Sequence, residues 1–417
     1  MKNTYFCRKL DNLKLETYIS RKLFKSSETN FSKTILKISV ISVALGLSVM
    51  ILSIGVSMGF QKAVKEKVAG FEGDIRISNF DYNQSAELTP INSDSLLLNQ
   101  LLRVHNVQAV QPFALKGGII KHEKLISGII LKGVTPSYNW SFFKSHLTIG
   151  RFPNLTDSTT LNNVLISDNL ARKLHLDTST SFYIYFIQEP PRVRKLKVVG
   201  VFNTGFEEFD ANYILGDIKL IQKINGWSDN QVSGIEIHLS NTEQAILSSE
   251  QINNLIDYNL KAESLAERYP LITDWLKLLD TNVLFIIGLM VIIAGITIIA
   301  TILILILEKT SFIGVLKSMG ASNRMIQKIF FYQAIYLIGI GMIAGNVIGL
   351  TLGFLQKKFE LIPLDPVNYY MNTVPFHIDI QSVILLNLGV LFVIGLMILW
   401  PVNTISNISP IRAIRFK

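Results

Sequence analysis

The stretch EKTSFIGVLKSMGASNRMIQKIFFYQ, residues 308–333, lies between two long apolar runs and decides how the rest of the chain is interpreted. Its apolar residues recur at helical spacing and stop at Gly320, a residue that ends helices because it readily adopts a positive φ. Ser322 is a suitable N-cap for a second helix that continues into the next apolar run. The stretch therefore predicts a short helix that connects two membrane-spanning helices.

Four segments of the chain are apolar enough to cross a hydrocarbon core, which takes about 20 helical residues. These segments are 38–60, 283–307, 330–355 and 383–401, and none of the four contains Asp, Glu, Lys or Arg. The overall composition, 49% hydrophobic and 17% charged, is also typical of a membrane protein that carries a sizeable soluble part. The sequence therefore predicts an α-helical membrane protein with four transmembrane helices and a large extracytoplasmic α+β domain.

This prediction divides the chain into nine parts. They are an N-terminal segment 1–33, a first transmembrane helix 34–60 that continues as a stalk, an outside domain 61–282, a transmembrane helix 283–307, a loop 308–328, a transmembrane helix 329–355, a loop 356–382, a transmembrane helix 383–401 and a tail 402–417.

Lysine and arginine near the membrane ends indicate the orientation. The segment 1–33 carries eight of them, the loop 308–328 four and the tail 402–417 three, whereas the loop 356–382 carries two. Both termini and the loop 308–328 are therefore expected in the cytoplasm, with the domain 61–282 outside. The net charge of +9 is explained by basic flanks beside anionic lipid, and nucleic-acid binding is not expected.

The outside domain is expected to mix helices and strands. The helix of the first span is expected to continue to about Gly70, because apolar residues keep their helical spacing that far. Residues 107–134 have the pattern of several strands broken by Gly and Pro, and residues 251–279 look helical. The only cysteine, Cys7, precedes the first span, so no disulfide is expected in this domain.

No catalytic, cofactor-binding or metal-binding residues are predicted. The six histidines are scattered, and no hydrolase or metalloprotease motif is present. The acidic stretch GFEEFD, residues 205–210, offers three carboxylates for Ca²⁺ but lacks the spacing of an EF-hand loop, so a solvated loop is favoured. No Gly is followed by Lys anywhere in the chain, so the loop that cradles nucleotide phosphates is missing and ATP hydrolysis would have to come from a partner.

Two features characterise the membrane part. The absence of ionisable residues from the spans argues against a proton-coupled transporter. In the third span a glycine recurs at every fourth residue, which permits close approach of a neighbouring helix. These predicted helix-packing residues are Gly341, Gly345, Gly349 and Gly353.

The short helix in the loop 308–328 allows two interpretations. Phe312, Leu316 and Met319 fall on one face, with Ile313 and Val315 flanking it, where no core of this protein is expected. Such a face suits either a groove of another protein or the surface of the lipid. The spacing favours neither.

A family resemblance enters at these residues. EKTSFIGVLKSMGAS followed by IFFYQAIYLIGIGMIAGNVIG resembles the loop and third span of FtsX-like ABC transporter permeases, and the ending SPIRAIRFK resembles their C-terminal signature through Pro410, Ala413 and Arg415. The first span with GFEGDIRIS, and the stretches VVGVFNTGFEEFDANYI and PLDPVNYYMNTVPFHID, are similar to one branch, the lipoprotein-releasing permeases of the LolC and LolE type, whose outside domain is a MacB-like periplasmic core.

The resemblance implies a multi-pass permease of the inner membrane of a Gram-negative bacterium, with the large domain in the periplasm. It implies a separate ABC ATPase dimer that uses ATP and Mg²⁺, a second permease subunit, identical or paralogous, a lipoprotein substrate, a periplasmic lipoprotein carrier and membrane lipids as partners. It implies an ATPase-coupling element made of Glu308, Phe312, Ile313, Leu316, Met319, Gly320, Ala321 and Ser322. A cavity for lipid chains is expected beside Met50, Ile54 and Met58 of the first span, although a helix facing ordinary lipid has the same composition.

Two other functions compete with lipoprotein release. One is a macrolide-exporter-type permease that moves another periplasmic substrate mechanically, although such chains usually carry a fused ATPase or a differently built outside domain. The other is a cell-division-type transmembrane signalling protein, whose outside domain is typically much smaller than residues 61–282. The four spans exclude a soluble enzyme.

Overall fold

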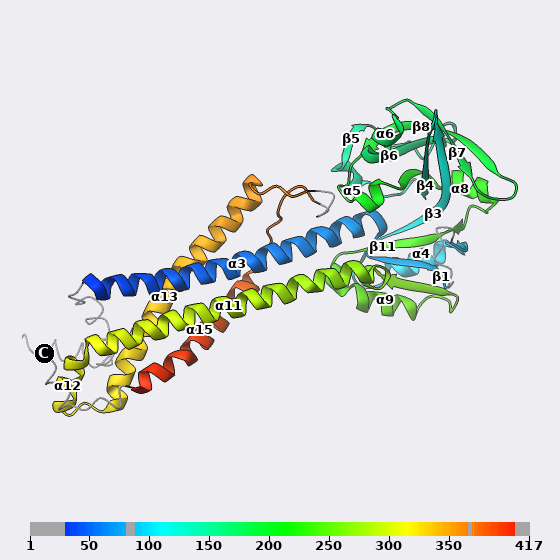
Figure 1. The fold of residues 1–417 in the computed structure, drawn as a ribbon. Coiled ribbons are helices and arrows are strands. Elements are labelled where there is room, and N and C mark those ends of the chain that lie inside the picture. Colours follow the sequence, from blue (N-terminus) through cyan, green and yellow to red (C-terminus); the bar gives the residue numbers. More distant parts are fainter. Residues whose placement is uncertain (1–29, 81–87, 366–368, 370, 405–417) are drawn as a thin grey trace, which may run out of the picture. The chain divides into compact units, whose positions relative to one another are not determined.

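The computed structural model describes residues 30–80, 88–365, 369 and 371–404. Cys7, most of the basic N-terminal segment and the C-terminal signature lie outside the described residues. The chain forms two compact units, which we call the helical unit (Met1–Phe60, Lys277–Ile362 and Val374–Lys417) and the α+β unit (Gln61–Leu276 and Pro363–Thr373). Figure 1 shows the long helices and the strands that build them.

Within the described residues, five helices contribute to the helical unit, and four of them are long. They are α3 (Asn30–Glu72), α11 (Pro270–Glu308), α12 (Thr310–Ser318), α13 (Asn323–Phe359) and α15 (Ile380–Asn403). By length and composition, the four long helices are able to cross a membrane. At 43 residues, α3 is about 65 Å long, roughly twice what a bilayer core requires. It ends at Glu72, two residues past the expected end, because Gly73 turns the chain with a φ of +75°.

The glycines of α13 lie against α3. A Cβ added to Gly345 would lie 2.8 Å from the carbonyl oxygen of Ala44, and one added to Gly349 would lie 3.1 Å from Cα of Ser48. The side chain of Ser48 also donates a hydrogen bond to the carbonyl oxygen of Gly345, at 3.0 Å. At Gly341 an added Cβ would lie 2.7 Å from Cβ of Val43. The backbones therefore approach as closely as they do only because these side chains are missing.

Phe376 fills the space beside the last glycine of the row. An added Cβ at Gly353 of α13, or at Gly55 of α3, would overlap the Phe376 ring. The neighbouring His377 donates its backbone N–H to the carbonyl oxygen of Gly55, at 2.9 Å. The segment that precedes α15 is therefore wedged between the two glycine-bearing helices.

Polar side chains inside the helical unit are paired with one another. Asn346 of α13 and Asn387 of α15 exchange hydrogen bonds of 2.7 and 3.0 Å between their amide groups. Ser39 of α3 shares a hydrogen bond with Thr301 of α11, and Ser42 donates to Thr297 at 3.2 Å. These bonds satisfy groups that are costly to leave unpaired in an apolar surrounding.

The α+β unit is built on one ten-stranded sheet with the order β12-β1-β11-β3-β4-β9-β6-β8-β5. The remaining strand of this sheet, β7, pairs with both β3 and β8. It thereby closes a ring of six strands, in the order β3, β4, β9, β6, β8 and β7. The side chains of Phe182, Ile184 and Phe186 point into the core of this ring, whereas the alternate Tyr183 and Tyr185 are exposed. The strands are β1 (Ile75–Asn79), β2 (Ile91–Asn92), β3 (Val107–His122), β4 (Leu125–Val134), β5 (Leu147–Gly150), β6 (Asn163–Ser167), β7 (Ser181–Phe186), β8 (Arg192–Phe202), β9 (Tyr213–Asp217), β10 (Gln231–Val232), β11 (Gly234–Leu239) and β12 (Leu260–Ser264).

Short helices connect the strands and cover parts of the sheet. They are α4 (Ser95–Leu102), α5 (Ser141–Lys144), α6 (Asp168–Leu174), α7 (Glu207–Asp210), α8 (Ile218–Asn225), α9 (Ala245–Asn253) and α10 (Leu265–Arg268), with 3₁₀ turns at Ser158–Thr160 and Thr242–Gln244.

Two expectations for this unit were wrong. Residues 251–279 do not form a continuous helix, because β12 interrupts them and pairs antiparallel with β1, from Leu260 opposite Asn79 to Ser264 opposite Ile75. Residues 107–134 form two long strands rather than several strands broken by Gly and Pro. Pro112 is tolerated inside β3 because β4 pairs with β3 only from Phe113 onward, so at Pro112 the strand has β11 beside it and no β4 partner.

The close contact between α13 and α3 yields the first testable prediction. Gly345→Ala forces a methyl group into the backbone of α3 and is expected to destabilise the protein by about 1–3 kcal/mol, as overpacking does. The measurement is thermal unfolding of the purified full-length protein in detergent. Gly339→Ala is the matched control on the same helix, since nothing lies within 4 Å of a Cβ there. Equal midpoints for the two variants would contradict the tight fit.

Candidate functional site

The link between α11 and α13 is shaped by local sequence signals. The side chain of Thr310 bonds the carbonyl oxygen of Leu307 at 2.7 Å where α12 begins, and Gly320 has a φ of +89° just after α12 ends. The hydroxyl of Ser322 then accepts the backbone N–H of Met325 at 3.3 Å and caps α13. The Gly-Ala-Ser turn thus separates two helices with defined ends, and we call residues 308–322 the α12 link.

The side chains of α12 are divided between core and surface. Ile313 is fully buried in the core of the helical unit, and Leu316 is half-buried against that core. Val315 and Met319, four residues apart, are 49% and 79% exposed. The expectation that no core of this protein is available to α12 was therefore wrong for Ile313. Among the described residues of α12, the exposed large apolar side chains are those of Val315 and Met319.

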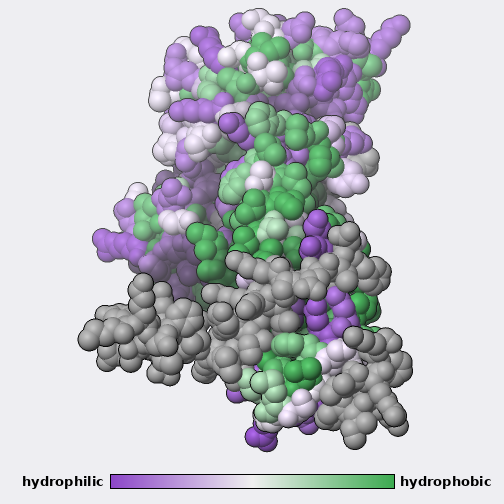
Figure 2. Space-filling view, turned by 90° about the vertical axis from the view of Figure 1, so that its left-hand side faces the viewer, coloured by the Kyte–Doolittle hydropathy of each residue, from purple (hydrophilic) through white to green (hydrophobic). Residues whose placement is uncertain are grey.

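The remaining residues of the α12 link are placed as follows. Glu308 ends α11 and lies 3.7 Å from the ammonium of Lys309, measured from its carboxylate oxygen Oε1. Phe312 is half-buried, and Ala321 packs against the core of the helical unit. Figure 2, which views the molecule from the side of Figure 1 where α12 lies, shows hydrophobic surface bordered by hydrophilic residues.

The first span does not present all of its expected cavity residues. Met50 is only 1% exposed and belongs to the core shared with the other helices, whereas Ile54 and Met58 are half-buried. A cavity wall that includes Met50 would therefore require the helices around it to separate.

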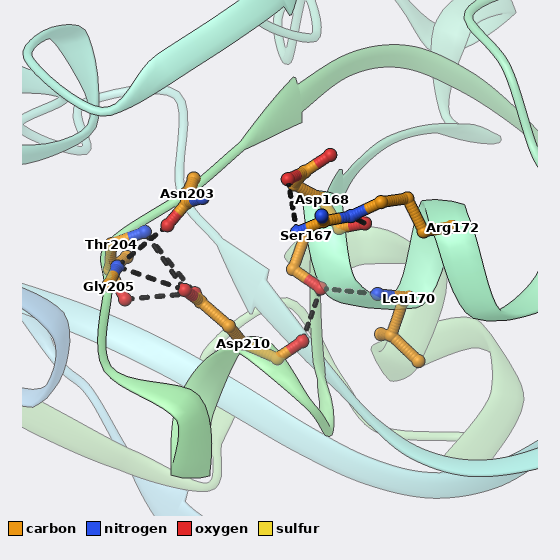
Figure 3. Close-up of polar contacts among 8 residues, drawn as sticks. All are labelled: Ser167, Asp168, Leu170, Arg172, Asn203, Thr204, Gly205 and Asp210. Atoms are coloured by element: carbon orange, nitrogen blue, oxygen red, sulfur yellow. Dashed lines mark hydrogen bonds and ion pairs between the residues drawn. The ribbon is translucent and has the colours of Figure 1, made fainter. Parts of the chain in front are cut away.

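The acidic stretch 205–210 is not the solvated loop that was expected. Its last residues form α7, and the carboxylate of Asp210 is buried. Asp210 accepts hydrogen bonds from the backbone N–H groups of Thr204 and Gly205, both at 3.0 Å, and from the hydroxyl of Thr204 at 2.8 Å (Figure 3). The carbonyl oxygen of Asp210 accepts the hydroxyl of Ser167, the residue that caps α6. The stretch thus joins the ends of β6 and β8, and among the described residues no group of three or more metal-ligating side chains occurs.

Burial changes the acidity of this carboxylate. It raises the pKa of Asp210 from 3.8 to about 6, while the hydrogen bonds from Thr204 and Gly205 and the charge of Lys67 act in the opposite direction. Asp210 therefore holds its proton more tightly in the folded protein than in the unfolded chain. Its contribution to stability is largest below the unfolded pKa and is lost as the pH rises through about 6.

Sequence reasoning missed a cluster of buried charges in the α+β unit. Glu72, Arg76, Lys132, Glu236 and Arg268 lie together at the end of α3 and the start of α11. Two of them sit in the patterns Ile-Arg-Ile and Ile-Glu-Ile, at residues 75–77 and 235–237, which normally indicate a strand with one solvated face. Those residues are register partners, Arg76 opposite Glu236, and opposite charges on paired strands were the available signal.

Together, these features define a protein in which a mixed α+β unit is inserted between the first and second of four long apolar helices. Family models match both parts of the chain, as MacB-like periplasmic core domain over residues 37–255 and as FtsX-like permease C-terminal over residues 284–410. The chain belongs to this MacB-like and FtsX-like family of ABC transporter permeases. The family resemblance seen in the sequence is thereby confirmed.

Curated relatives match the chain along nearly its whole length. The lipoprotein-releasing system transmembrane protein LolC of Buchnera aphidicola subsp. Schizaphis graminum is 23% identical over 402 residues, which cover 92% of this chain and 94% of the relative. The LolC protein of Neisseria meningitidis serogroup B is 22% identical over 439 residues, covering 97% and 99%. Among solved structures, the periplasmic region of MacB from Actinobacillus actinomycetemcomitans matches 53% of this chain and 99% of its own, with 14% identity and a TM-score of 0.34.

The pKa of Asp210 yields a second prediction. Between about pH 7.5 and about pH 4.5, protonation of this group is expected to add about 2 kcal/mol to the free energy of unfolding of the α+β unit. Asp210→Asn, which resembles the protonated form, is expected to remove that part of the pH dependence. The measurement is urea unfolding of the full-length protein, followed by tryptophan fluorescence, for wild type and variant at both pH values. An unchanged pH dependence in the variant would show that Asp210 is not the titrating group.

Proposed function

We propose that this chain is the permease subunit of an ABC transporter that extracts lipoproteins from the inner membrane of a bacterium for transfer toward the outer membrane. The observation that carries the proposal is the match to several LolC proteins over more than nine-tenths of the chain. Both family models fall on the units that such a permease needs, one on the α+β unit with its stalk and one on the last three long helices. In this proposal both termini face the cytoplasm and the α+β unit lies in the periplasm.

Energy for the extraction is proposed to come from a separate ABC ATPase dimer, which binds ATP and Mg²⁺, while this chain binds neither. A second permease subunit, identical or paralogous, completes the membrane part, and a periplasmic carrier receives the lipoprotein. Chains of this family that release a lipid-anchored protein need an apolar path for acyl chains. Ile54 and Met58, half-buried on α3, are proposed to border that path, and Met50 joins them when the helices separate.

The α12 link is proposed to dock on the ATPase. Val315 and Met319 provide the exposed apolar surface, while Ile313 fixes α12 to the core of the helical unit. Gly320, Ala321 and Ser322 end the helix and begin α13, so movement of α12 is passed directly into α13. The glycine contacts of α13 then connect it to α3.

A second candidate function is mechanical transport of another substrate. A relative described as the uncharacterized ABC transporter permease YknZ of Bacillus subtilis (strain 168) is 21% identical over 402 residues, with 91% and 94% coverage. The same fold therefore serves proteins that are not named for lipoproteins.

The docking role of α12 yields a third prediction. Met319→Asp places a charge on the exposed apolar surface of α12 and is expected to abolish copurification of the ABC ATPase, because a desolvated carboxylate without a partner opposes binding. Met319→Leu keeps the surface apolar and is expected to retain the ATPase. Leu361→Asp adds the same charge at a 66% exposed residue beyond the opposite end of α13 and serves as the second control. Retention of the ATPase by Met319→Asp would contradict docking through this surface.

The proposed substrate yields a fourth prediction. Depletion of the protein in its own cell is expected to leave outer-membrane lipoproteins in the inner membrane, as measured by separating the two membranes and blotting for a lipoprotein. Return of the wild-type chain, but not of Met319→Asp, is expected to restore sorting. Normal sorting after depletion would contradict lipoprotein release and would leave transport of another substrate as the better account.

A further inference from the structure

Two passages of the chain between the helical unit and the α+β unit end at the same place. The helix α3 passes into the α+β unit at Gln61 and ends at Glu72, and Arg268 stands two residues before α11 begins at Pro270. Both residues lie within the α+β unit. Their side chains meet there, with Arg268 Nη2 2.9 Å from Glu72 Oε2.

Glu72 is the hub of these contacts. Its carboxylate also lies 3.8 Å from Arg76 of β1 and accepts the hydroxyl of Tyr213 of β9 at 3.4 Å. The guanidinium of Arg268 in addition reaches the backbone carbonyl oxygen of Glu72, at 3.4 Å. One carboxylate thus connects the end of α3, the last residue of α10, which stands two residues before α11, and two strands of the sheet.

A second buried ion pair extends the connection across the sheet. Lys132 of β4 lies 2.7 Å from Glu236 of β11 and also donates to the carbonyl oxygen of Phe71, the residue before Glu72. The ring of Phe71 stacks on that of Phe209, with centroids 4.4 Å apart. The last turn of α3 is therefore attached to the rest of the α+β unit by the ring of Phe71, by the backbone carbonyl oxygen of Phe71 and by the carboxylate of Glu72.

The burial of these charges makes the arrangement specific. The side chain of Glu72 is 4% exposed and that of Arg268 is 12% exposed. Arg268 has two further nitrogens, Nε and Nη1, that are buried without a hydrogen-bond partner in the described part of the chain, so its charge is compensated by Glu72. With three cations against two carboxylates in the cluster, loss of Glu72 would leave three buried positive charges facing only Glu236. Removing one member of a buried charge cluster is strongly destabilising to the arrangement that buried it.

We infer that Glu72 is a positioning residue that locks the end of α3, the start of α11 and the sheet of the α+β unit into one rigid joint. Movement of either helix then moves the sheet, because the ends of the helices do not shift relative to the sheet. The part of this inference that concerns transport rests on the proposed function, whereas the rigidity of the joint does not.

The rigidity is tested first, on the full-length protein with Cys7→Ser as background. Spin labels are attached at Lys65→Cys on α3 and at Leu271→Cys on α11, both exposed positions of the α+β unit. Double electron–electron resonance measures the distance between the two labels. The distribution of that distance is expected to be narrow in the background protein and broad after Glu72→Gln. Glu66→Gln is the matched control, since Glu66 lies on the same helix in an exposed ion pair with Lys62. A distribution as narrow in Glu72→Gln as in the control would overturn the inference.

A milder variant covers the case in which Glu72→Gln does not fold. Arg268→Lys keeps the positive charge but loses the rigid planar guanidinium, whose Nη2 reaches both the carboxylate and the backbone carbonyl oxygen of Glu72. It is expected to broaden the same distribution to a smaller extent, and an unbroadened distribution in this variant would again count against the joint.

The consequence for transport is tested with the ATPase partner in lipid vesicles that carry a lipoprotein. Glu72→Gln is expected to retain ATP hydrolysis and to lose most of the lipoprotein released per ATP, with Glu66→Gln unchanged. Full release by a variant with a broadened label distribution would overturn the coupling role. If the wild type itself releases no lipoprotein, the proposed function fails, and the label distances still decide on the joint.

Discussion

Within the α+β unit, the attachment of the end of α3 to α10 and to the sheet depends on the burial of one carboxylate, that of Glu72. A charge removed from water must be compensated by a charge at a defined distance, because its solvation energy is lost whatever the surroundings. Arg268 and Arg76 supply that compensation from two other elements. Since both arginines are mostly buried as well, none of the three side chains has an equally favourable alternative position, and the elements that carry them are fixed together.

The helical unit obtains its specificity by a different route. In an apolar surrounding the hydrophobic effect does not choose between helix partners, so shape and a few hydrogen bonds must do so. The row of glycines on α13 lets α3 approach closely, and α3 presents Ala44 and Ser48 there together with Val43, Leu47 and Ile51. The hydrogen bonds between the amides of Asn346 and Asn387 select α15 as the other helix that packs against α13. The two units are thus specified by charge in one case and by the absence of side chains in the other.

The difference explains which parts of the fold were predictable. The end of α3, which the sequence predicts within two residues, the turn at Gly320 and the glycine row depend on neighbouring residues, so local patterns were sufficient for them. The strand Leu260–Ser264 was missed because its partner, Ile75–Asn79, is remote in the sequence and its own residues do not alternate clearly.

The same limit applies to the buried charges. Arg76 alternates with isoleucines as a solvated strand residue does, but in the fold it lies against Glu72 of α3 and over the ring of Phe113 of β3. Asp210 is acidic among acidic neighbours, and its burial depends on the backbone N–H groups that Thr204 and Gly205 direct at it. In both cases the group that pairs with the charged side chain is brought to it by the tertiary structure. Composition alone therefore favoured the prediction that the side chain is solvated.

The correction at Ile313 bears on how α12 is proposed to work. If the whole apolar face of α12 were free, the helix would be held only by the chain on either side of it, and a partner that pushed on it would turn it before moving α13. Ile313 is buried in the core of the helical unit while Met319 is exposed. One face thus anchors the helix and an adjacent surface remains available to a partner. A docking element that transmits force needs both, and a sequence pattern that assigns every apolar residue of α12 to docking overlooks the anchor.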